Sequence, residues 1–589
     1  MMMNSSTDSP QIMQDLDSKP QNQQLQPLCD TIISTQEFES IVWDETYTYP
    51  KRIKTKFQIK VTKGGIKYTT IDGSIHRIDD FTNIQENPQF WVNMEQIKYC
   101  QWQGEYQENI KKIGKWTMTW NGNLLKDVGG QYSDSGQKIG QWKEIIKNYQ
   151  NSAQAYEIGS YSNNVKTGIW KVIYNDKEIG EGSYNEFGVK NGKWIQLNDT
   201  FWKYQSQVTL HGEYKNGTKV GQWDIYYQEV GNSIQIGGGV YDQQGDGLRN
   251  GQWIQLSENF HKWNQITYNG RYQCDKKVGK WDIYYGLEQM YINIINKILL
   301  NIRGGGQYDE QGCELKIGKW IELSENFRLN SQAIYEGEYC NGNKVGKWNI
   351  YFRFKGNKLI GGGSYDNEGL HKIGRWIELS DCYEQDRQVT YHGEYRNGKK
   401  VGRWDIYFDK INKQYLIGGG SYDEDGLYKI GMWVEWSEHD GHIIYNGEYR
   451  NGKKVGRWDI YFFNINKNYL IGGGLYDEEG LYKIGRWIEV SNGFEVDRQV
   501  TYNGEYRNGK KVGRWDIYFK FVENKQIGGG LYDEEGEIKV GRWIELSDNF
   551  HQGEQLIYEG FYKRSKKEGT WVQKNIQQIQ PACLLNNRK

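Results

Sequence analysis

The chain is poor in residues that would interrupt a sheet or cross a membrane. Only 6 of its 589 residues are proline, and none lies between Pro88 and Pro581. Because proline lacks the backbone N–H that a sheet ladder needs, this gap permits one long sheet. No stretch approaches the roughly 20 consecutive apolar residues of a membrane-spanning helix, and the polar start lacks the apolar segment of a signal peptide. We therefore expect a soluble, cytoplasmic protein.

Excess charge of either sign is also missing. The chain has 74 Lys and Arg against 75 Asp and Glu, a net charge of −1. Without a positive field, no nucleic-acid partner is expected. The 7 cysteines are scattered and unpaired by any motif, so they are interpreted as reduced thiols of an intracellular protein.

Motifs for catalysis are scarce as well. No Gly-x-Ser-x-Gly elbow occurs, and Gly-Lys-Lys-Val-Gly is not a phosphate-binding loop. We expect no enzyme, no cofactor, no metal and no small-molecule substrate.

What the sequence does have is repetition rich in 72 Gly, 45 Tyr and 24 Trp. From Cys100 two units alternate, one of the form Tyr-x-Gly-Glu-Tyr-x-Asn-Gly-Lys-Lys-Val-Gly-Arg-Trp and the other of the form Gly-Gly-Gly-x-Tyr-Asp-Glu-Glu-Gly-x-x-Lys-Ile-Gly-Arg-Trp. The first recurs nine times and the second eight. This composition is typical of strands and tight turns rather than of helices.

The chain divides by composition into four segments. Residues 1–40 are polar and are predicted to be a disordered tail. Residues 41–99 show strand alternation around Gly64-Gly65 and Asp72-Gly73, residues 100–573 hold the repeats, and residues 574–589 form a second tail. The apolar stretch from Met290 to Ile302 is predicted to lengthen one hairpin.

Strand pairing can be predicted from one copy of the first unit. Asn397-Gly398 is the strongest two-residue signal for a type I′ turn. Centring the turn there places Gly393 opposite Gly402 and Tyr391 opposite Trp404. In the second unit, Asp425-Gly426 likewise places Gly420 opposite Gly431. Opposed glycines would leave a slot in which aromatic rings from neighbouring hairpins lie flat on backbone.

These observations predict an all-β fold, an elongated antiparallel meander of repeated β-hairpins in a single sheet. The alternative is a β-propeller, because two hairpins supply the four strands of a blade and there are about eight periods.

The repeat also resembles a known family. Tyr445-Asn-Gly447-Glu-Tyr449-Arg-Asn-Gly452-Lys-Lys-Val-Gly456 is similar to the membrane occupation and recognition nexus (MORN) repeat, over roughly residues 100–572. Where that repeat continues Gly-x-Gly, this chain has Gly-x-Trp, a variant similar to MORN-like repeats of bacterial antitoxin-like proteins. The resemblance implies scaffolding in cytoskeletal and membrane-apposed assemblies, and binding to acidic phospholipids.

Two sets of side chains are candidate contact surfaces. The aromatic set lies on one predicted face and could receive a protein partner. The basic set lies on the other face with Glu394 and Asp405, and could meet a partner or acidic lipid. The aromatic set comprises Tyr391, Tyr395, Trp404, Tyr445, Tyr449, Trp458, Tyr502, Tyr506 and Trp515, and the basic set comprises Arg396, Lys399, Arg403, Arg450, Lys453, Arg457, Arg507, Lys510 and Arg514.

Two further clusters are better explained by turn and loop chemistry. The turns at Asp423, Asp477 and Asp533 supply carboxylates, but they lack the ligand spacing of an EF-hand. Glu438, His439 and His442 are interpreted as a surface loop between hairpins.

The sequence thus predicts a non-enzymatic scaffold that presents a repeat surface to protein partners, with cytoskeletal association as a further expectation. The alternatives are a peripheral membrane tether that binds acidic phospholipids and an antitoxin-like protein inhibitor.

Overall fold

The computed structural model describes most of the chain. The described residues are 32–44, 51–62, 65–70, 75–79, 93–107, 111–199, 201, 207–229, 232–258, 260–262, 264–286, 302–325, 327, 330–353, 356–381, 383–410, 413–437, 442–465, 467–491, 494, 498–519, 525–547 and 550–576. The predicted lengthened hairpin at 290–301 and the pair Glu438 and His439 lie outside them.

A small N-terminal sheet precedes the repeats. It contains β1 (Ile32–Asp44), β2 (Lys51–Thr62), β3 (Gly65–Thr70) and β4 (Ile75–Asp79), paired in that order, and is followed by α1 (Met94–Tyr99). The hairpin predicted at Gly64-Gly65 is confirmed, since Val61 pairs with Ile66. Strand β1 begins at Ile32, inside the segment that was predicted to be a tail to residue 40, and α1 had no counterpart in the sequence prediction.

The repeats form one antiparallel meander of 34 strands, β5 to β38, as predicted. The strands are β5 (Cys100–Gln107), β6 (Lys111–Trp120), β7 (Asn123–Tyr132), β8 (Lys138–Ile145), β9 (Ala155–Ser162), β10 (Val165–Tyr174), β11 (Lys177–Tyr184), β12 (Lys190–Leu197), β13 (Val208–Lys215), β14 (Thr218–Glu229), β15 (Asn232–Tyr241), β16 (Arg249–Leu256), β17 (Ile266–Gln273), β18 (Lys276–Tyr285), β19 (Ile302–Tyr308), β20 (Lys316–Leu323), β21 (Ala333–Cys340), β22 (Asn343–Phe352), β23 (Lys358–Tyr365), β24 (Lys372–Leu379), β25 (Gln388–Arg396), β26 (Lys399–Lys410), β27 (Lys413–Tyr422), β28 (Lys429–Trp436), β29 (Ile443–Arg450), β30 (Lys453–Phe462), β31 (Tyr469–Tyr476), β32 (Lys483–Val490), β33 (Val500–Arg507), β34 (Lys510–Phe519), β35 (Lys525–Tyr532), β36 (Lys539–Leu546), β37 (Leu556–Lys563) and β38 (Lys566–Asn575).

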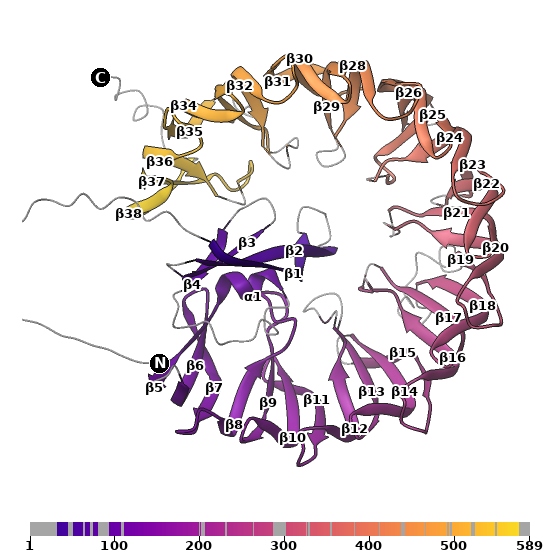
Figure 1. Ribbon diagram of the computed structural model, residues 1–589, viewed down its shortest axis with the longest axis vertical. Helices are drawn as coiled ribbons and strands as arrows, with labels where there is room; N and C mark the ends of the chain where they lie inside the picture. Colours follow the sequence, from indigo (N-terminus) through magenta and orange to yellow (C-terminus); the bar gives the residue numbers. More distant parts are fainter. Residues whose placement is uncertain are drawn as a thin grey trace, which may run out of the picture.

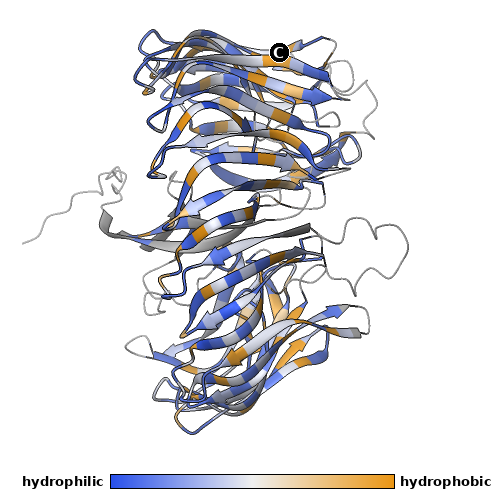
Figure 2. Ribbon diagram, turned by 90° about the vertical axis from the view of Figure 1, so that its right-hand side faces the viewer, coloured by the Kyte–Doolittle hydropathy of each residue, from blue (hydrophilic) through white to orange (hydrophobic). Residues whose placement is uncertain are grey.

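The meander curves into an open ring. Figure 1 shows successive hairpins around the rim, with β1 to β4 and α1 inside the curve. Figure 2 shows the same band from the side, with its strands crossing the band's width. Each hairpin pairs with the next, so the sheet is not divided into propeller blades, and it is not closed into a barrel.

The predicted turn is confirmed, but the predicted register holds only near it. Asn397 and Gly398 have φ of 48° and 77°, as a type I′ turn requires. Glu394 pairs with Val401 as expected. Beyond Gly393 the register shifts, so Tyr391 pairs with Ile406 instead of Trp404.

A bulge causes this correction. Gly402 adopts φ of 60°, a left-handed conformation that glycine allows without strain, and the strand bulges there. The second unit behaves alike: Tyr422 pairs with Lys429, but past the bulge Gly419 pairs with Val434. Gly420 therefore does not face Gly431. Because the slip is two residues, each side chain stays on its predicted face.

The N-terminal sheet packs on the first hairpins of the ring. Phe57 and Tyr68 join a buried cluster with Met118, Trp120 and Val128 from β6 and β7. Helix α1 is tied to the loop after β8, because the buried Gln96 amide donates hydrogen bonds to the carbonyl of Lys147 at 3.0 Å and of Tyr149 at 3.2 Å. The N-terminal sheet therefore covers the inner side of the ring where the repeats begin.

Candidate interaction surfaces

Each repeat tryptophan lies flat on a glycine of the adjacent strand. A Cβ added to Gly393 would stand 2.2 Å from the ring of Trp404, and the same overlap occurs in every hairpin from Gly104 with Trp116 to Gly560 with Trp571. The predicted glycine slot is thus real, but the ring that fills it comes from the same hairpin rather than from a neighbouring one.

The tryptophans and the unit tyrosines form a long ladder in two runs, here called the tryptophan ladder. Ring contacts alternate Tyr and Trp without a break from Tyr106 to Trp404, and again from Tyr422 to Trp571. All are edge-to-face, such as Tyr449 and Trp458 at 5.2 Å. This geometry is the favourable one for aromatic pairs.

The tryptophan ladder buries most of the candidate aromatic surface. Trp404, Trp458 and Trp515 are only 2–3% exposed, and Tyr395, Tyr449 and Tyr506 are buried beside them. Tyr391, Tyr445 and Tyr502 pack against the same cluster and are half-buried. These nine residues are therefore core residues that bury one another, and the expectation of an open aromatic face is corrected. Their binding of a partner stays a prediction.

A layer of lysines covers the ladder. Lys400 Nζ stands 4.1 Å from the ring centre of Trp404, and lysines at the matching position stand over sixteen of the seventeen tryptophans; Trp253 is the exception, with Arg249 over the next ring, Tyr272. Such contacts contribute about 0.5–2 kcal/mol each. The sequence analysis did not assign this role to Lys400.

Six glutamates neutralise pairs of these lysines. Glu435 accepts from Lys429 at 2.6 Å and lies 3.0 Å from Lys454, and it also accepts from the hydroxyl of Tyr449 at 2.9 Å. We call this arrangement a lysine–glutamate cluster. It recurs around Glu144, Glu322, Glu378, Glu489 and Glu545.

The electrostatics of each cluster favour the charged carboxylate. Burial alone would raise the pKa of Glu435, but the charges of Lys454 and Lys429 and their hydrogen bonds outweigh it and hold the pKa below its usual value. The pKa values of the other five glutamates are lowered for the same reasons.

The candidate basic set lies on the opposite face. Arg403, Arg457 and Arg514 each form an ion pair with an aspartate two residues later in the same strand, at 2.7 Å. Arg507 contacts Glu534 at 3.1 Å. The other members, Arg396, Lys399, Arg450, Lys453 and Lys510, are exposed. This face therefore carries charges of both signs, as the sequence predicted for Asp405.

The acidic turns are bound by their own backbone. The Asp423 carboxylate accepts from the N–H of Leu427 at 2.7 Å, and Asp477 accepts from Leu481 at the same distance. These carboxylates serve the turn. In the part of the chain that the structure describes, no group of three His, Cys, Asp or Glu side chains could hold a metal ion.

A second row of buried aromatics, which the sequence analysis missed, lies toward the other ends of the strands. Most second-unit tryptophans are followed, seven residues later, by an aromatic residue in the loop between hairpins. This loop aromatic packs on the aromatic residue that lies four positions after the preceding first-unit tryptophan. Phe494 is 1% exposed and packs on Phe462. The others are Tyr149, Phe201, Phe260, Phe327, Tyr383 and Phe550. Where the loop lacks one, Trp436 fills the space beside Phe408. The recurring Ser-x-x-Phe was the signal for this row.

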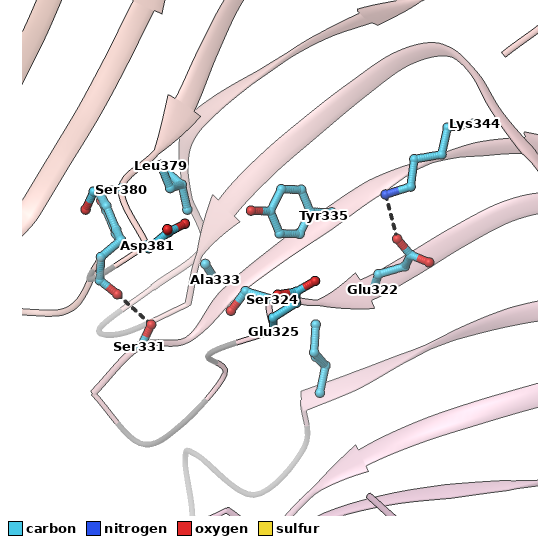
Figure 3. A pocket seen from close by; sticks show the side chains of 12 residues that line it. Glu322, Ser324, Glu325, Ser331, Ala333, Tyr335, Lys344, Leu379, Ser380 and Asp381 are labelled. Atoms are coloured by element: carbon cyan, nitrogen blue, oxygen red, sulfur yellow. Dashed lines mark hydrogen bonds and ion pairs between the residues drawn. The ribbon is translucent and has the colours of Figure 1, made fainter. Parts of the chain in front are cut away.

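One pocket opens between two such loops. It has a volume of about 420 Å³ and is lined by Glu322, Glu325, Tyr335, Ser380 and Asp381, among others. Figure 3 shows these side chains with Lys344 on Glu322. Ser331 also lines the pocket, and its hydroxyl donates to the carbonyl of Tyr383 at 2.5 Å. Its lining offers hydrogen bonds to a small polar group.

Exposed apolar side chains recur at one rim. Leu370, Leu427 and Leu481 follow the acidic turns of successive copies and are 57–62% exposed, and Tyr428 and Tyr482 beside them are each 48% exposed. We call these five residues the leucine rim.

Comparison with protein families and with characterised proteins finds no match. The resemblance to the MORN repeat therefore stays a prediction. No helix among the described residues is long and apolar enough to cross a membrane.

Proposed function

We propose that this chain is a non-enzymatic scaffold that binds protein partners on the outer surface of its repeats. The observation that carries the proposal is the leucine rim. Its leucines stay more than half exposed while the tryptophans of the same hairpins are almost fully buried. Recurring exposed apolar side chains are typical of surfaces that bind other proteins.

The rim is also pre-organised for binding. The backbone N–H groups of Leu370, Leu427 and Leu481 donate to the aspartate that opens each turn, at 2.7–2.9 Å. A fixed turn loses little entropy when a partner binds. Each leucine buried by a partner would contribute up to about 1.5–3 kcal/mol.

The experiment compares the natural chain, tagged in its own cell, with the variant Leu370→Ser, Leu427→Ser, Leu481→Ser. We expect the natural chain to cross-link to protein partners and to remain with the detergent-resistant cytoskeleton, and the variant to lose both. A matched control is Leu124→Ser with Ile169→Ser, which removes side chains that are 63% and 62% exposed but lie in the first copies.

Two outcomes would overturn the proposal: a variant that retains the same cross-links as the natural chain, or equal loss in the control. Cytoplasmic location and attachment to the cytoskeleton are part of this proposal and are tested by the same fractionation.

A further inference from the structure

Two of the eight lysine–glutamate positions carry glutamine. The residue two positions after each second-unit tryptophan is glutamate in six copies, but it is Gln196 after Trp194 and Gln255 after Trp253. A glutamine keeps the shape of glutamate and removes its charge, so the cations of these two copies lose the carboxylate that the other six provide.

The first substituted copy keeps the geometry of a cluster without its charge balance. Lys190 Nζ lies 3.3 Å from the side-chain oxygen of Gln196, and the hydroxyl of Tyr214 donates to the same oxygen at 3.0 Å. Lys190 and Lys219 stand 4.2 Å and 4.3 Å from the ring centres of Trp194 and Trp223. No carboxylate of the described residues forms an ion pair with either lysine; Glu157 acts on Lys190, and Asp199 acts on both lysines, only at longer range.

The second substituted copy continues the imbalance. The Tyr272 hydroxyl donates to Gln255 at 2.5 Å and accepts from Arg249 at 2.7 Å, and Arg249 also forms an ion pair with Asp275. Lys277 stands 4.5 Å from the ring centre of Trp281, and among the described residues no ion pair reaches its ammonium group. Glu314 is the nearest acidic influence on Lys277. Lys190, Lys219 and Lys277, here called the lysine band, thus lie on β12, β14 and β18 as half-buried cations.

The pKa values of the three lysines also indicate that a nearby negative charge is lacking. The pKa of Lys219 is lowered to about 8, first by burial and then by the positive charges of Lys190 and Arg249, while Asp199 opposes them. The pKa values of Lys190 and Lys277 are also lowered, first by burial. A half-buried cation without a counter-ion is costly, and a carboxylate brought to it recovers part of that cost.

We propose that the lysine band is the docking site for an acidic segment of a protein partner, whose Asp and Glu carboxylates supply the charge that Gln196 and Gln255 lack. The chain itself shows the chemistry of recognition, because six other copies hold a carboxylate between two ladder lysines and a tyrosine hydroxyl. This inference rests on the proposed scaffold function and names the chemistry of one partner.

The experiment restores the missing charge. In Gln196→Glu, Gln255→Glu, both copies regain the glutamate of the other six, so the variant is expected to fold and to melt at or above the temperature of the natural chain. We expect a dye-labelled octaglutamate peptide to bind the natural chain, as measured by fluorescence anisotropy at low salt, and to bind this variant about tenfold more weakly.

A control with the same net charge separates a local effect from a general one. Gln131→Glu, Gln252→Glu adds two charges at exposed positions on the opposite face, and we expect peptide binding within about twofold of the natural chain. Equal weakening in both variants, or no binding by the natural chain, would overturn the inference. So would binding to phosphatidylserine vesicles without binding to the peptide, which would assign the band to a membrane.

Failure here is distinguishable from failure of the scaffold. If the leucine-rim variant loses its partners but Gln196→Glu, Gln255→Glu does not weaken peptide binding, the scaffold stands and the lysine band is not the acidic site. If the leucine-rim variant keeps all partners, the scaffold proposal fails whatever the peptide does.

Discussion

At the scale of single residues, glycine and tryptophan are paired by shape. The tryptophan ring needs a flat surface, and a backbone without a Cβ provides it, so the two residues recur together in every hairpin. The triple glycine of the second unit has its own cause: a Cβ on Gly419 would stand 2.3 Å from the carbonyl oxygen of Trp404, and one on Gly418 would stand 2.4 Å from that of Val434. Only glycine permits such close strands.

Replacing one of these glycines tests the ladder. In Gly447→Ala the new Cβ would lie 2.3 Å from the ring of Trp458, so the ring must move. We expect the free energy of unfolding to fall by about 1–3 kcal/mol, measured by denaturant titration with tryptophan fluorescence. The control is Gly431→Asn, a left-handed position with open space around it, where asparagine is tolerated. An equal loss in the control would refute the steric account.

Removing one cluster charge tests the electrostatics. The pKa of Glu435 is lower in the folded chain than its usual 4.5, so this carboxylate stabilises the fold above that pH, and its contribution is lost as the pH falls through the folded value. We expect the free energy of unfolding of Glu435→Gln to be about 1 kcal/mol lower than that of the natural chain near neutral pH.

The pH dependence is the discriminating measurement for this variant. The difference between Glu435→Gln and the natural chain should disappear as the pH falls below the folded pKa of Glu435. A difference that persists unchanged in acid would assign the loss to packing rather than to charge.

At the scale of the strand pair, two separate cores hold each hairpin. The tryptophan ladder occupies the half near the Asn-Gly turn, and the loop aromatics cover the other half. Phe494, for example, closes a cluster with Ile443, Ile460 and Ile471. The loops between hairpins therefore contribute to the hydrophobic core as well as connecting strands.

The loop aromatics give a prediction at this scale. We expect Phe494→Ala to cost about 3–5 kcal/mol, because a ring that is 1% exposed leaves a cavity. Hydrogen exchange should increase mainly in β29 to β32, which supply the cluster around Phe494. The control is Leu481→Ala, at a residue that is 57% exposed, which should change the free energy of unfolding by less than about 0.5 kcal/mol. Exchange that increases uniformly along the whole array in Phe494→Ala would contradict a local role for Phe494.

At the scale of the whole molecule, curvature determines the shape. Thirty-four strands spaced about 4.8 Å apart would span about 160 Å as a straight ribbon, yet Figure 1 shows the ends of the band brought toward each other around the N-terminal sheet. Twist accumulates over many strands, and the glycine bulges in each hairpin bend them further.

Solution scattering checks this shape. We expect a maximum dimension well below about 160 Å, with an interatomic distance distribution broader than that of a solid sphere. A value near the length of the straight ribbon would show that the band opens in solution.

The sequence by itself determined the parts that depend on neighbouring residues. The alternation of two units, the type I′ turn at Asn397-Gly398, the assignment of Tyr395 and Trp404 to one face, and the pairing of Glu394 with Val401 all follow from local turn chemistry and from the two-residue period of a strand.

Only the tertiary structure decided the rest. The register beyond Gly393 depends on the left-handed conformation of Gly402, which the sequence permits but does not require. The burial of Trp404, the placement of Lys400 on its ring within β26, and the sharing of Glu378 of β24 between Lys372 and Lys400 are contacts that form only in the folded sheet. Likewise, the carboxylate that the lysine band lacks can be recognised only by comparison with the six copies in which two cations share a glutamate.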